Sequence, residues 1–573
     1  MANWFVSAKK ADFNQIGEKF GITPILARII RNRDIISEEE ISLFLHGTLN
    51  ELYDPRMMKD MDKAVAFIRD AIHNKQRIRI IGDYDIDGIC ATYILLTGLQ
   101  KCGAVVDTKL PDRIKDGYGI NESIIKQAHE DGIEVLVTCD NGIAASSQIA
   151  YAKELGMTVI VTDHHEVPYE QVTEKKYVLP PADAVVDPHR IDCDYPFAGI
   201  CGAVVAYKVI QVLWEECGIK DSLTEELLEF AAFATIGDVM ELKDENRLIV
   251  KYGMEQLKNT SNIGLKALID ATGIDRDKIA PFHIGYILGP CLNASGRLDT
   301  AERALSLLTC QTTKDAAIIA GELKELNDSR KDMTQSFTEA ALKMIENPLE
   351  EADYTNDKVL VIYLPDCHES LAGIIAGRIK ERYYKPTFVL TNGEGEGLVK
   401  GSGRSIEAYH MYDEMTKCKE LFSKFGGHKM AAGLSMPIEN IALFRRQINE
   451  NATLTEDDMQ EKVLIDIPLP VSYVTEQLIS EIELLEPFGV GNPKPLFAEK
   501  DLIIQSLRIV GKNRNVVKLS LLGAGGVTVD AVWFGDGDSF LKKQGESISI
   551  AYFPTLNVYM GKSTIQLNVQ HYL

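Results

Sequence analysis

Three aspartates stand at alternate positions where a short apolar run ends. In "RIRIIGDYDIDGICATYILL", residues 77–96, the alternation typical of a strand leads into Asp83, Asp85 and Asp87, and a glycine then precedes an apolar, helix-like run. Carboxylates this close repel each other, and burying them is costly unless a positive group lies between them. The spacing therefore predicts a site for a divalent cation.

Further carboxylates and imidazoles follow other predicted elements. Asp140 in "VTCDNGI" and the run Asp163, His164 and His165 in "VTDHHEV" come directly after strand-like segments, and Asp238 in "ATIGDVMEL" lies near a helix end. Oxygen ligands with an imidazole and no thiolate suit Mn²⁺ or Mg²⁺. At least four carboxylates are enough for two ions about 3.5–4 Å apart, which hydrolyse phosphate esters or anhydrides.

Each of these clusters also has a purely structural interpretation. An aspartate after a strand usually forms a turn or caps a helix, and adjacent histidines are more often a surface pair than a ligand pair. All four clusters would nevertheless converge on one edge of one sheet. This joint arrangement favours the metal site.

The elements that must position these residues alternate between strand and helix. From about residue 56 to Asp238, β-rich runs such as "RIRIIG", "EVLVTC", "TVIVT" and "DAVVD" are separated by helical segments. This alternation implies a mostly parallel sheet, and ligands bind beyond the carboxyl ends of the strands in such sheets. The predicted fold class is α/β, with the acidic clusters at those ends.

The whole chain divides into five predicted segments. Residues 1–55 are expected to be helical from Trp4 onward, and an apolar stripe ending at "NP" predicts one connecting helix from Thr313 to Glu346. The last hundred residues contain six β-rich runs, beginning with "KVLIDIPL", which predict a small barrel or sandwich. The segments are 1–55, helical; 56–312, the parallel-sheet domain; 313–346, the connecting helix; 347–456, a second αβ domain; and 457–573, the β-barrel.

Composition limits the protein classes that fit. A net charge of −23 argues against a nucleic-acid partner. Between Leu371 and Met430, however, ten Lys or Arg stand against seven Asp or Glu, which a binding groove and a solvated surface explain equally well. Ten cysteines without a C-x-x-C pair argue against zinc fingers and disulfides. With no apolar leader and no run of roughly 18 apolar residues, we expect a cytoplasmic protein without a membrane partner.

The ordered motifs resemble a known superfamily. "GDYDIDG", "VTCDNGI", "VTDHH" and "ATIGDVMEL" are similar to the signature of the DHH phosphoesterases. "LNASGRLD", "ESLAGIIAGRI", "GSGRS", "FGGHKMAAG" and "EPFGVGNPKPLF" then resemble the bacterial RecJ family, including its DHH-associated domain and OB-fold. The resemblance covers nearly the whole chain. It implies a 5′-to-3′ exonuclease specific for single-stranded DNA, releasing 5′-mononucleotides by two-metal hydrolysis in DNA repair and recombination.

The resemblance also implies a role for each matching residue. Asp140 would lie between two Mn²⁺ or Mg²⁺ ions, and Asp83 would be either a ligand or a support. His165 would contact the scissile phosphate or assist the leaving oxygen, Asp163 would orient a histidine, and Arg297 would hold a phosphate oxygen. The implied metal ligands are Asp83, Asp85, Asp87, Asp140, His164 and Asp238. The implied substrate contacts are Arg378, Ser402, Arg404, Gly427 and His428.

A second surface is expected on the OB-like region. Its basic residues and two aromatic residues fit a stacking surface for single-stranded nucleic acid, although the aromatic residues fit a core equally well. These residues are Arg508, Lys512, Arg514, Lys518, Trp533 and Phe534. One departure from the family is Cys291, where a basic residue is common, which leaves one phosphate contact in question.

Partners and rival functions follow from the same resemblance. Many family members continue into a further C-terminal domain associated with partner proteins, so a single-strand-binding protein or a helicase is only a candidate partner, and a monomer is expected. Rival functions are hydrolysis of short RNAs or cyclic dinucleotides, a pyrophosphatase, and a binding factor without catalysis. The β-rich module and the complete set of ligands favour the exonuclease.

Overall fold

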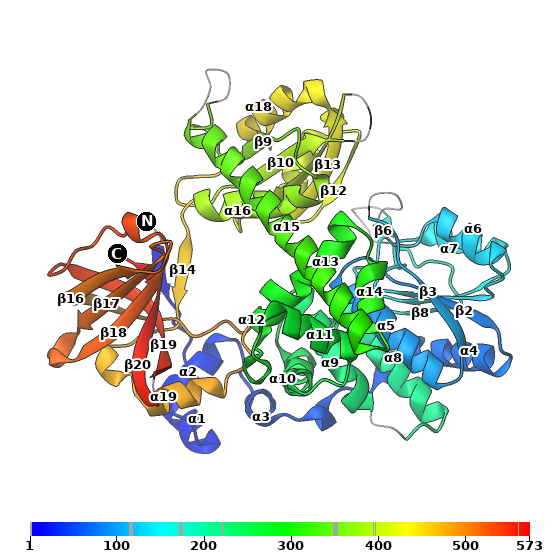
Figure 1. Cartoon of the computed structure of the whole chain (residues 1–573), viewed down its shortest axis with the longest axis horizontal. Helices are drawn as coiled ribbons and strands as arrows, with labels where there is room; N and C mark the ends of the chain where they lie inside the picture. The colour runs from blue at the N-terminus through cyan, green and yellow to red at the C-terminus, as the bar shows by residue number, and fades with distance from the viewer. Residues whose placement is uncertain are drawn as a thin grey trace. The chain divides into compact units, whose positions relative to one another are not determined.

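The structure is a computed structural model that forms two compact units (Figure 1). It describes residues 3–113, 119–170, 176–220, 223–347, 353–393, 395, 397–559 and 561–573. The first unit comprises Val6–Glu325 and Ile465–Leu573, and the second comprises Leu326–Leu464 with the N-terminal residues up to Phe5. Within these described ranges, no helix has the length and apolar character needed to cross a membrane.

A five-stranded parallel sheet lies at the centre of one half of the first unit. Its strand order is β3-β2-β4-β5-β8, and every neighbouring pair is parallel. The predicted α/β class with a mostly parallel sheet is therefore confirmed. The strands are β2 (Arg77–Ile81), β3 (Val105–Lys109), β4 (Val135–Cys139), β5 (Thr158–Thr162) and β8 (Ala184–Val186). β3 was not predicted, because "VVDTK" is half polar and lies at the sheet edge.

Helices cover both faces of this sheet. The helices α6 (Glu122–Glu130) and α7 (Ser146–Glu154) share one apolar core with strand residues such as Leu136 and Val159. On the other face, α8 (Gly202–Glu216) packs against α4 (Met61–His73) and α5 (Ile86–Lys101). The remaining helices of this half are α9 (Leu223–Gly237), α10 (Asp244–Lys258), α11 (Ile263–Thr272), α13 (Gly289–Leu298) and α14 (Glu302–Leu308). The acidic residues lie at the edge formed by the carboxyl ends of the strands, between these two layers of helices.

The C-terminal part of the first unit is the expected β-barrel. The strand order is β15-β16-β17-β18-β20-β19, and an additional pairing of β16 with β19 closes the sheet on itself. The strands are β15 (Ile467–Pro468), β16 (Phe497–Val510), β17 (Val516–Leu522), β18 (Thr528–Phe534), β19 (Ser547–Tyr559) and β20 (Lys562–Tyr572). Closure leaves few unpaired strand edges.

The N-terminal helices complete the core of this barrel. They are α1 (Phe13–Phe20), α2 (Pro24–Asn32) and α3 (Glu38–His46). Leu26 and Ile30 of α2 lie in the same apolar core as Leu485 and the barrel residue Tyr552. Arg33 is almost fully buried, and its guanidinium donates to Asn492 Oδ1 at 2.8 Å and to Asp466 Oδ1 at 3.1 Å. The N-terminal helices and the C-terminal barrel thus form one body.

The first described residues are extended, which differs from the expected helical start at Trp4. β1 (Asn3–Val6) pairs with β14 (Lys462–Ile465), the first of the β-rich runs that were expected to join the barrel. Asn3 N–H donates to Glu461 O at 2.8 Å, and Ser7 N–H donates to Ile465 O at 2.9 Å. The residues "WFV" are aromatic and β-branched, which suits a strand once a partner strand is available.

The second unit contains a mixed sheet and the C-terminal part of a long helix. The helix α15 extends from Thr313 to Glu346, which are the predicted bounds. The sheet order is β12-β13-β11-β10-β9, with only β9 and β10 parallel. Its elements are β9 (Leu360–Tyr363), α16 (Glu369–Tyr383), β10 (Thr387–Asn392), β11 (Leu398–Arg404), α17 (Met411–Thr416), β12 (Lys424–Gly427), β13 (Ala431–Pro437) and α18 (Ile441–Asn451).

Candidate active site

The acidic residues gather at the carboxyl edge of the parallel sheet. Asp83 follows β2, Asp140 follows β4 and Asp163 follows β5, while β2 and β4 are paired at Ile81 and Thr138. Because neighbouring parallel strands end side by side, the residues after them are brought together. Three groups of ligand atoms result, each within 4.8 Å: Asp83, Asp85 and Asp140; Asp87, His164 and Asp238; and Asp140, His164 and His165.

Two of the aspartates are fixed by helix N-termini. The Asp85 side chain caps α5, accepting hydrogen bonds from the N–H groups of Asp87 at 3.0 Å and Gly88 at 3.2 Å. Asp87 is fully buried, and its carboxylate accepts from the first N–H groups of α8, Gly202 at 2.7 Å and Ala203 at 2.8 Å. The positive end of a helix favours a carboxylate. Both side chains are therefore fixed before any ligand binds.

Asp140 has a left-handed backbone, with φ +60°, at the turn after β4. Its Oδ1 lies 3.1 Å from His164 Nε2. The next residue, Asn141, is fully buried and links two strands, since its Nδ2 donates to Ile81 O at 3.0 Å and Cys139 O at 2.9 Å. Asn141 is a positioning residue that sequence reasoning missed. Its place in "CDNG" resembles an ordinary turn, and only the strand pairing shows its function.

Asp163 orients His165 through a contact between their side chains. Its Oδ1 lies 2.7 Å from His165 Nδ1 and accepts from His164 N–H at 2.8 Å, and its Oδ2 accepts from Ile143 N–H at 2.9 Å. Burial disfavours the charge on Asp163, but the bond and charge of His165 outweigh it and lower the pKa of the carboxyl. Burial likewise opposes charging of His165, yet its bond to Asp163 raises the pKa to about 9.

Asp83, Asp140 and Asp238 resist ionisation. Burial, with the charge of Asp85, raises the pKa of Asp83 to about 8, and burial with Asp87 raises the pKa of Asp238 to about 8. Burial and several neighbouring carboxylates raise the pKa of Asp140 well above its usual value. Burial lowers the pKa of His164, which favours the neutral, ligating imidazole. These buried carboxyl groups can all be ionised without a large cost in free energy only when cations lie between them. The donor groups therefore fit the implied metal ions.

Cationic side chains lie beside the acidic loop. Arg297 follows Gly296, where an added Cβ would lie 2.6 Å from Tyr84 O, so this turn of α13 packs directly on the loop between Asp83 and Asp85. Arg113, which sequence reasoning missed, lies 4.8 Å from the centre of the Tyr84 ring. It follows the unpredicted strand β3, so nothing in the sequence placed it at the catalytic edge.

A further edge residue, Asp187, was also missed as part of the site. It follows β8 and is fully buried, with one oxygen accepting from His189 N–H at 2.7 Å. Burial and the charge of Asp163 raise the pKa of its carboxyl to about 8. Asp187 is therefore close enough to His165 for the charge of that histidine to act against the rise in its pKa.

Four of the predicted substrate contacts lie on β11 and at the β12–β13 turn of the second unit's sheet. Ser402 and Arg404 stand two residues apart on β11, so their side chains point to the same face. Arg404 pairs with Ala431, whose O accepts from His428 N–H at 2.8 Å, and Gly427 pairs with Ala432. Gly427 has φ +150° and lets β12 turn into this position.

The Arg404 guanidinium lies against the helix α16. A Cβ atom on Gly373 would be 2.7 Å from Arg404 Nη2, and Nη1 donates to Gly403 O at 2.8 Å. The fifth predicted contact, Arg378, lies one turn further along α16, where its Nη1 donates to Gln335 Oε1 at 3.3 Å. The five residues therefore lie on β11, at the β12–β13 turn and on α16 of this unit.

The two aromatic residues of the barrel differ in their exposure. Trp533 packs against Phe540 and Tyr572, with ring centroids 5.3 Å and 5.5 Å away, and lies partly buried against the barrel core. Phe534 is 64% exposed and shares the outer face with the paired residues Arg508 and Lys518. Of the other basic residues, Arg514 forms an ion pair with Asp538 at 2.7 Å.

Cys291, where related sequences often carry a basic residue, is 1% exposed within α13. A buried thiol cannot replace a cation on a phosphate. Cys291 therefore does not provide the phosphate contact that was left in question at this position.

Three family models match separate parts of the chain. The DHH family N-terminal domain matches residues 77–235, the DHHA1 domain matches 356–453, and the RecJ OB domain matches 465–571. These ranges contain the parallel sheet, the mixed sheet and the barrel, respectively.

Similar proteins extend the match over almost the full chain. The single-stranded-DNA-specific exonuclease RecJ of Bacillus subtilis is 36% identical, covering 96% of this chain and 68% of that protein. The Escherichia coli protein of the same description is 32% identical, covering 96% of both chains. The crystal structure of RecJ with Mn²⁺ from Thermus thermophilus is similar with a TM-score of 0.83 and 27% identity, over 100% of this chain and 79% of that one. The chain belongs to the RecJ family of single-stranded-DNA-specific exonucleases in the DHH superfamily.

Proposed function

We propose that this chain removes nucleotides from the 5′ end of single-stranded DNA and releases 5′-mononucleotides. The observation that carries this proposal is the convergence of six carboxylate and imidazole ligands on one sheet edge, with His165 and Arg297 beside them. The relatives in Bacillus subtilis and Escherichia coli are described as single-stranded-DNA-specific exonucleases. We place the reaction in the cytoplasm and assign it to DNA repair and recombination.

The ligand set would hold two divalent ions. Asp83, Asp85, Asp87, Asp140, His164 and Asp238 supply oxygen and imidazole donors that suit Mn²⁺ or Mg²⁺, as in the related crystal structures with Mn²⁺ and with Mg²⁺. When bound, such ions provide a water nucleophile at neutral pH and stabilise negative charge on the phosphate.

The residues of the chain supply binding and proton donation. His165, with its pKa raised to about 9 through Asp163, is protonated at neutral pH and can donate from Nε2 to a phosphate oxygen or to the leaving oxygen. Its Nδ1 is occupied by Asp163, which fixes the direction of the ring. Arg297 can hold a phosphate oxygen with paired hydrogen bonds.

The second unit would contribute phosphate contacts. Ser402 and Arg404 lie on one face of β11, His428 follows at the β12–β13 turn, and the glycines beside them let the backbone approach a phosphate. In the segment that contains them, Leu371 to Met430, ten Lys or Arg stand against seven Asp or Glu. We propose that this face binds the DNA backbone, with the single strand as partner and a monomer as the active form. A single-strand-binding protein or a helicase is a further candidate partner.

End-labelled oligonucleotides test this proposal. Single-stranded DNA carrying a label at either the 5′ or the 3′ end is incubated with Mn²⁺, with Mg²⁺ and with chelator, beside duplex DNA and RNA. Immediate release of labelled mononucleotide from the 5′-labelled strand alone, only with metal, is the expected result. Equal attack on both ends, or cleavage confined to RNA, would contradict it.

A matched pair of variants connects the activity to the site. Asp140→Asn removes one ligand charge and should abolish release, while Asp277→Asn changes an aspartate in the 3₁₀ turn Arg276–Lys278, outside the ligand groups. Asp277→Asn should cleave at the wild-type rate. Activity that survives Asp140→Asn would assign the cleavage to another site or to a contaminating nuclease.

A further inference from the structure

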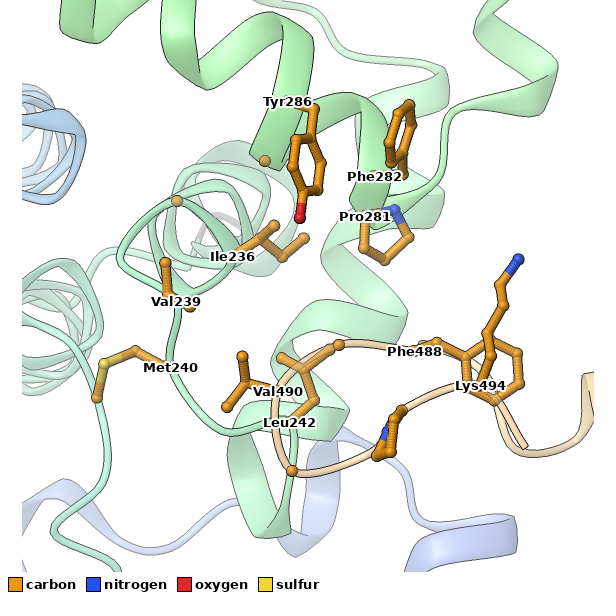
Figure 2. A pocket seen from close by; sticks show the side chains of 15 residues that line it. Ile236, Val239, Met240, Leu242, Pro281, Phe282, Tyr286, Phe488, Val490 and Lys494 are labelled. Carbon is orange, nitrogen blue, oxygen red and sulfur yellow. The ribbon is translucent and has the colours of Figure 1, made fainter. Parts of the chain in front are cut away.

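An apolar pocket of about 740 Å³ adjoins Asp238 within the first unit (Figure 2). Gly237 and Val239, the neighbours of Asp238 in the sequence, both line it. Consecutive Cα atoms are about 3.8 Å apart, so the pocket wall begins directly beside a proposed metal ligand. The pocket is thus the described cavity whose wall includes both sequence neighbours of Asp238.

Two exposed aromatic rings border the pocket. Phe282 belongs to α12 (Pro281–His283) and Tyr286 to the π-helical turn η4 (Ile284–Leu288). Their rings are stacked, with centroids 4.8 Å apart and an interplanar angle of 24°. The two residues are 59% and 69% exposed. A single exposed aromatic residue needs no explanation, but a stacked and exposed pair at the edge of a pocket is a surface on which a planar ring can stack.

The opposite wall is the loop in "EPFGVGNPKPLF", a motif that the catalytic site does not use. Val490 O accepts a hydrogen bond from Leu242 N–H at 2.7 Å, and a Cβ atom on Gly489 would be 2.7 Å from Leu242 Cδ1. Asn492 is fully buried and donates to Leu485 O at 2.7 Å and Pro487 O at 2.9 Å. The loop is thus fixed against the segment that follows Asp238, and Figure 2 shows Val490 beside Leu242 across the pocket from the rings.

The charge of the lining suits an anionic ligand. Among the described residues that line the pocket, Lys494 is the only charged one. Its Nζ lies 6.0 Å from the centre of the Phe488 ring and 4.9 Å from that of Phe553. Figure 2 shows the Lys494 side chain extending away from the loop that carries it, with the amino group at its tip. A ligand with a flat apolar part and a nearby negative group fits this arrangement.

We propose that this pocket binds an unpaired nucleobase of the DNA strand, stacked on the Phe282–Tyr286 pair, with Lys494 near the adjoining phosphate. This rests on the proposed function and names the part of the substrate that the site recognises outside the reacting phosphate. Pockets of about 300–1,000 Å³ enclose ligands of this size. A base inside a duplex is stacked and paired on both sides and is not free to enter. The pocket therefore favours single strands over duplexes.

Binding measurements on two paired variants test the role of the rings. Phe282→Ala with Tyr286→Ala removes both rings, and Phe282→Tyr with Tyr286→Phe keeps both. Tyr473→Ala is a control, because Tyr473 is 64% exposed and lies outside the residues that line the pocket. Fluorescence anisotropy with chelator present gives the affinity for a single-stranded oligonucleotide and for copies with one abasic site at each successive position.

The expected result is a coupling between the rings and one position of the strand. Loss of both rings should weaken binding about tenfold, as for a lost base–aromatic stack, while the ring-keeping pair and Tyr473→Ala stay near wild type. In the wild-type protein, an abasic site at one position of the strand should weaken binding by about the same factor. In the variant without rings, the same abasic site should not weaken binding any further.

Other outcomes would overturn the pocket assignment. Unchanged affinity without the rings would do so, as would a loss that is equal for intact and for every abasic strand, since that loss comes from the fold or the backbone. A wild-type protein that does not bind the single strand would end both proposals. A wild-type protein that binds but does not cut when Mn²⁺ is added would end the exonuclease proposal alone, because the anisotropy still reports on the pocket.

Discussion

Gly202 and Asp140 lie so close that a Cβ atom on Gly202 would be 2.8 Å from the Cβ of Asp140 and 3.0 Å from its Cα. Gly202 is also the first residue of α8, and its N–H donates to Asp87. One helix end therefore holds one carboxylate by hydrogen bonding and packs directly against another. The distance between these two proposed ligands depends on the missing side chain.

Gly202→Ala should reduce nuclease activity by about 100-fold, because displacing reacting groups by about 1 Å has effects of this size. The added methyl group forces the start of α8 away from Asp140 and shifts both carboxylates. Initial rates of mononucleotide release with Mn²⁺ measure the effect. Gly321→Ala in α15 is the matched control, since its Cβ would meet no heavy atom within 4 Å. The control should keep full activity, and a Gly202→Ala protein that does the same would show that the contact relaxes freely.

Asp140→Asn should separate metal binding from folding. Asparagine tolerates the left-handed backbone of Asp140, so the turn is preserved. Because burial and neighbouring carboxylates raise the pKa of Asp140, removing its charge should raise the melting temperature of the metal-free protein at neutral pH. The rise in melting temperature on adding Mn²⁺ should become smaller than in wild type. An unchanged response to Mn²⁺ would remove Asp140 from the ligand set.

Gly373→Ala should weaken DNA binding by displacing the Arg404 guanidinium, whose Nη2 would lie 2.7 Å from the new Cβ. The side chain can swing away, so the free energy of unfolding should change little while affinity falls toward that of Arg404→Ala. Gly377→Ala, one turn along the same helix, is the control, because its Cβ would stand 4.0 Å from Arg404 Cγ. Anisotropy and thermal melting on the three variants distinguish a binding effect from a folding effect. Equal DNA affinities for Gly373→Ala and Gly377→Ala would contradict a role of Arg404 in DNA binding.

Glu229→Gln should stabilise the protein at alkaline pH. Glu229 in α9 is 3% exposed; its Oε1 accepts from Thr260 Oγ1 at 2.6 Å, and its Oε2 has no hydrogen-bond partner among the described residues. Burial raises the pKa from 4.5 to about 7. The folded protein therefore binds this proton more tightly than the unfolded chain, and the free energy of unfolding falls as pH rises between these values.

Glu229→Gln removes this pH-dependent loss of stability. The free energy of unfolding of the variant should therefore exceed that of the wild type by about 3 kcal/mol above pH 7, and the difference should vanish near pH 4. Denaturant unfolding at pH 5 and pH 8 measures it. A gain that is the same at both pH values would show that the carboxyl group is not buried in its charged form.

The parallel sheet and the acidic residues at its carboxyl edge were predictable because their signals are local. The strand Val135–Cys139 is fully buried and mostly apolar, and Asp140 follows it directly, so both the strand and the place of the aspartate can be read from adjacent residues. The barrel and the helix α15 are similar cases. Family resemblance was needed for the roles of Ser402 and His428, whose proximity depends on strand pairing in another sheet.

The features that sequence analysis missed depend on contacts between distant segments. Trp4 lies in a strand only because residues near Lys462 are available to pair with it. Arg113 reaches Tyr84 from an edge strand with a weak pattern, and Asn141 joins two strands through its amide group. Each effect arises after the sheets have formed, so periodicity and spacing contain no trace of it.

The shared core of α2 and the barrel has a consequence for synthesis on the ribosome. Arg33 and its partner Asn492 are 459 positions apart, and the apolar face of α2 is covered by residues of that late region. This face stays without its partner until almost the entire polypeptide has been translated. The parallel-sheet domain can mature earlier, whereas the N-terminal helices must wait for the last hundred residues, and a prematurely terminated chain would expose them to chaperones and proteases.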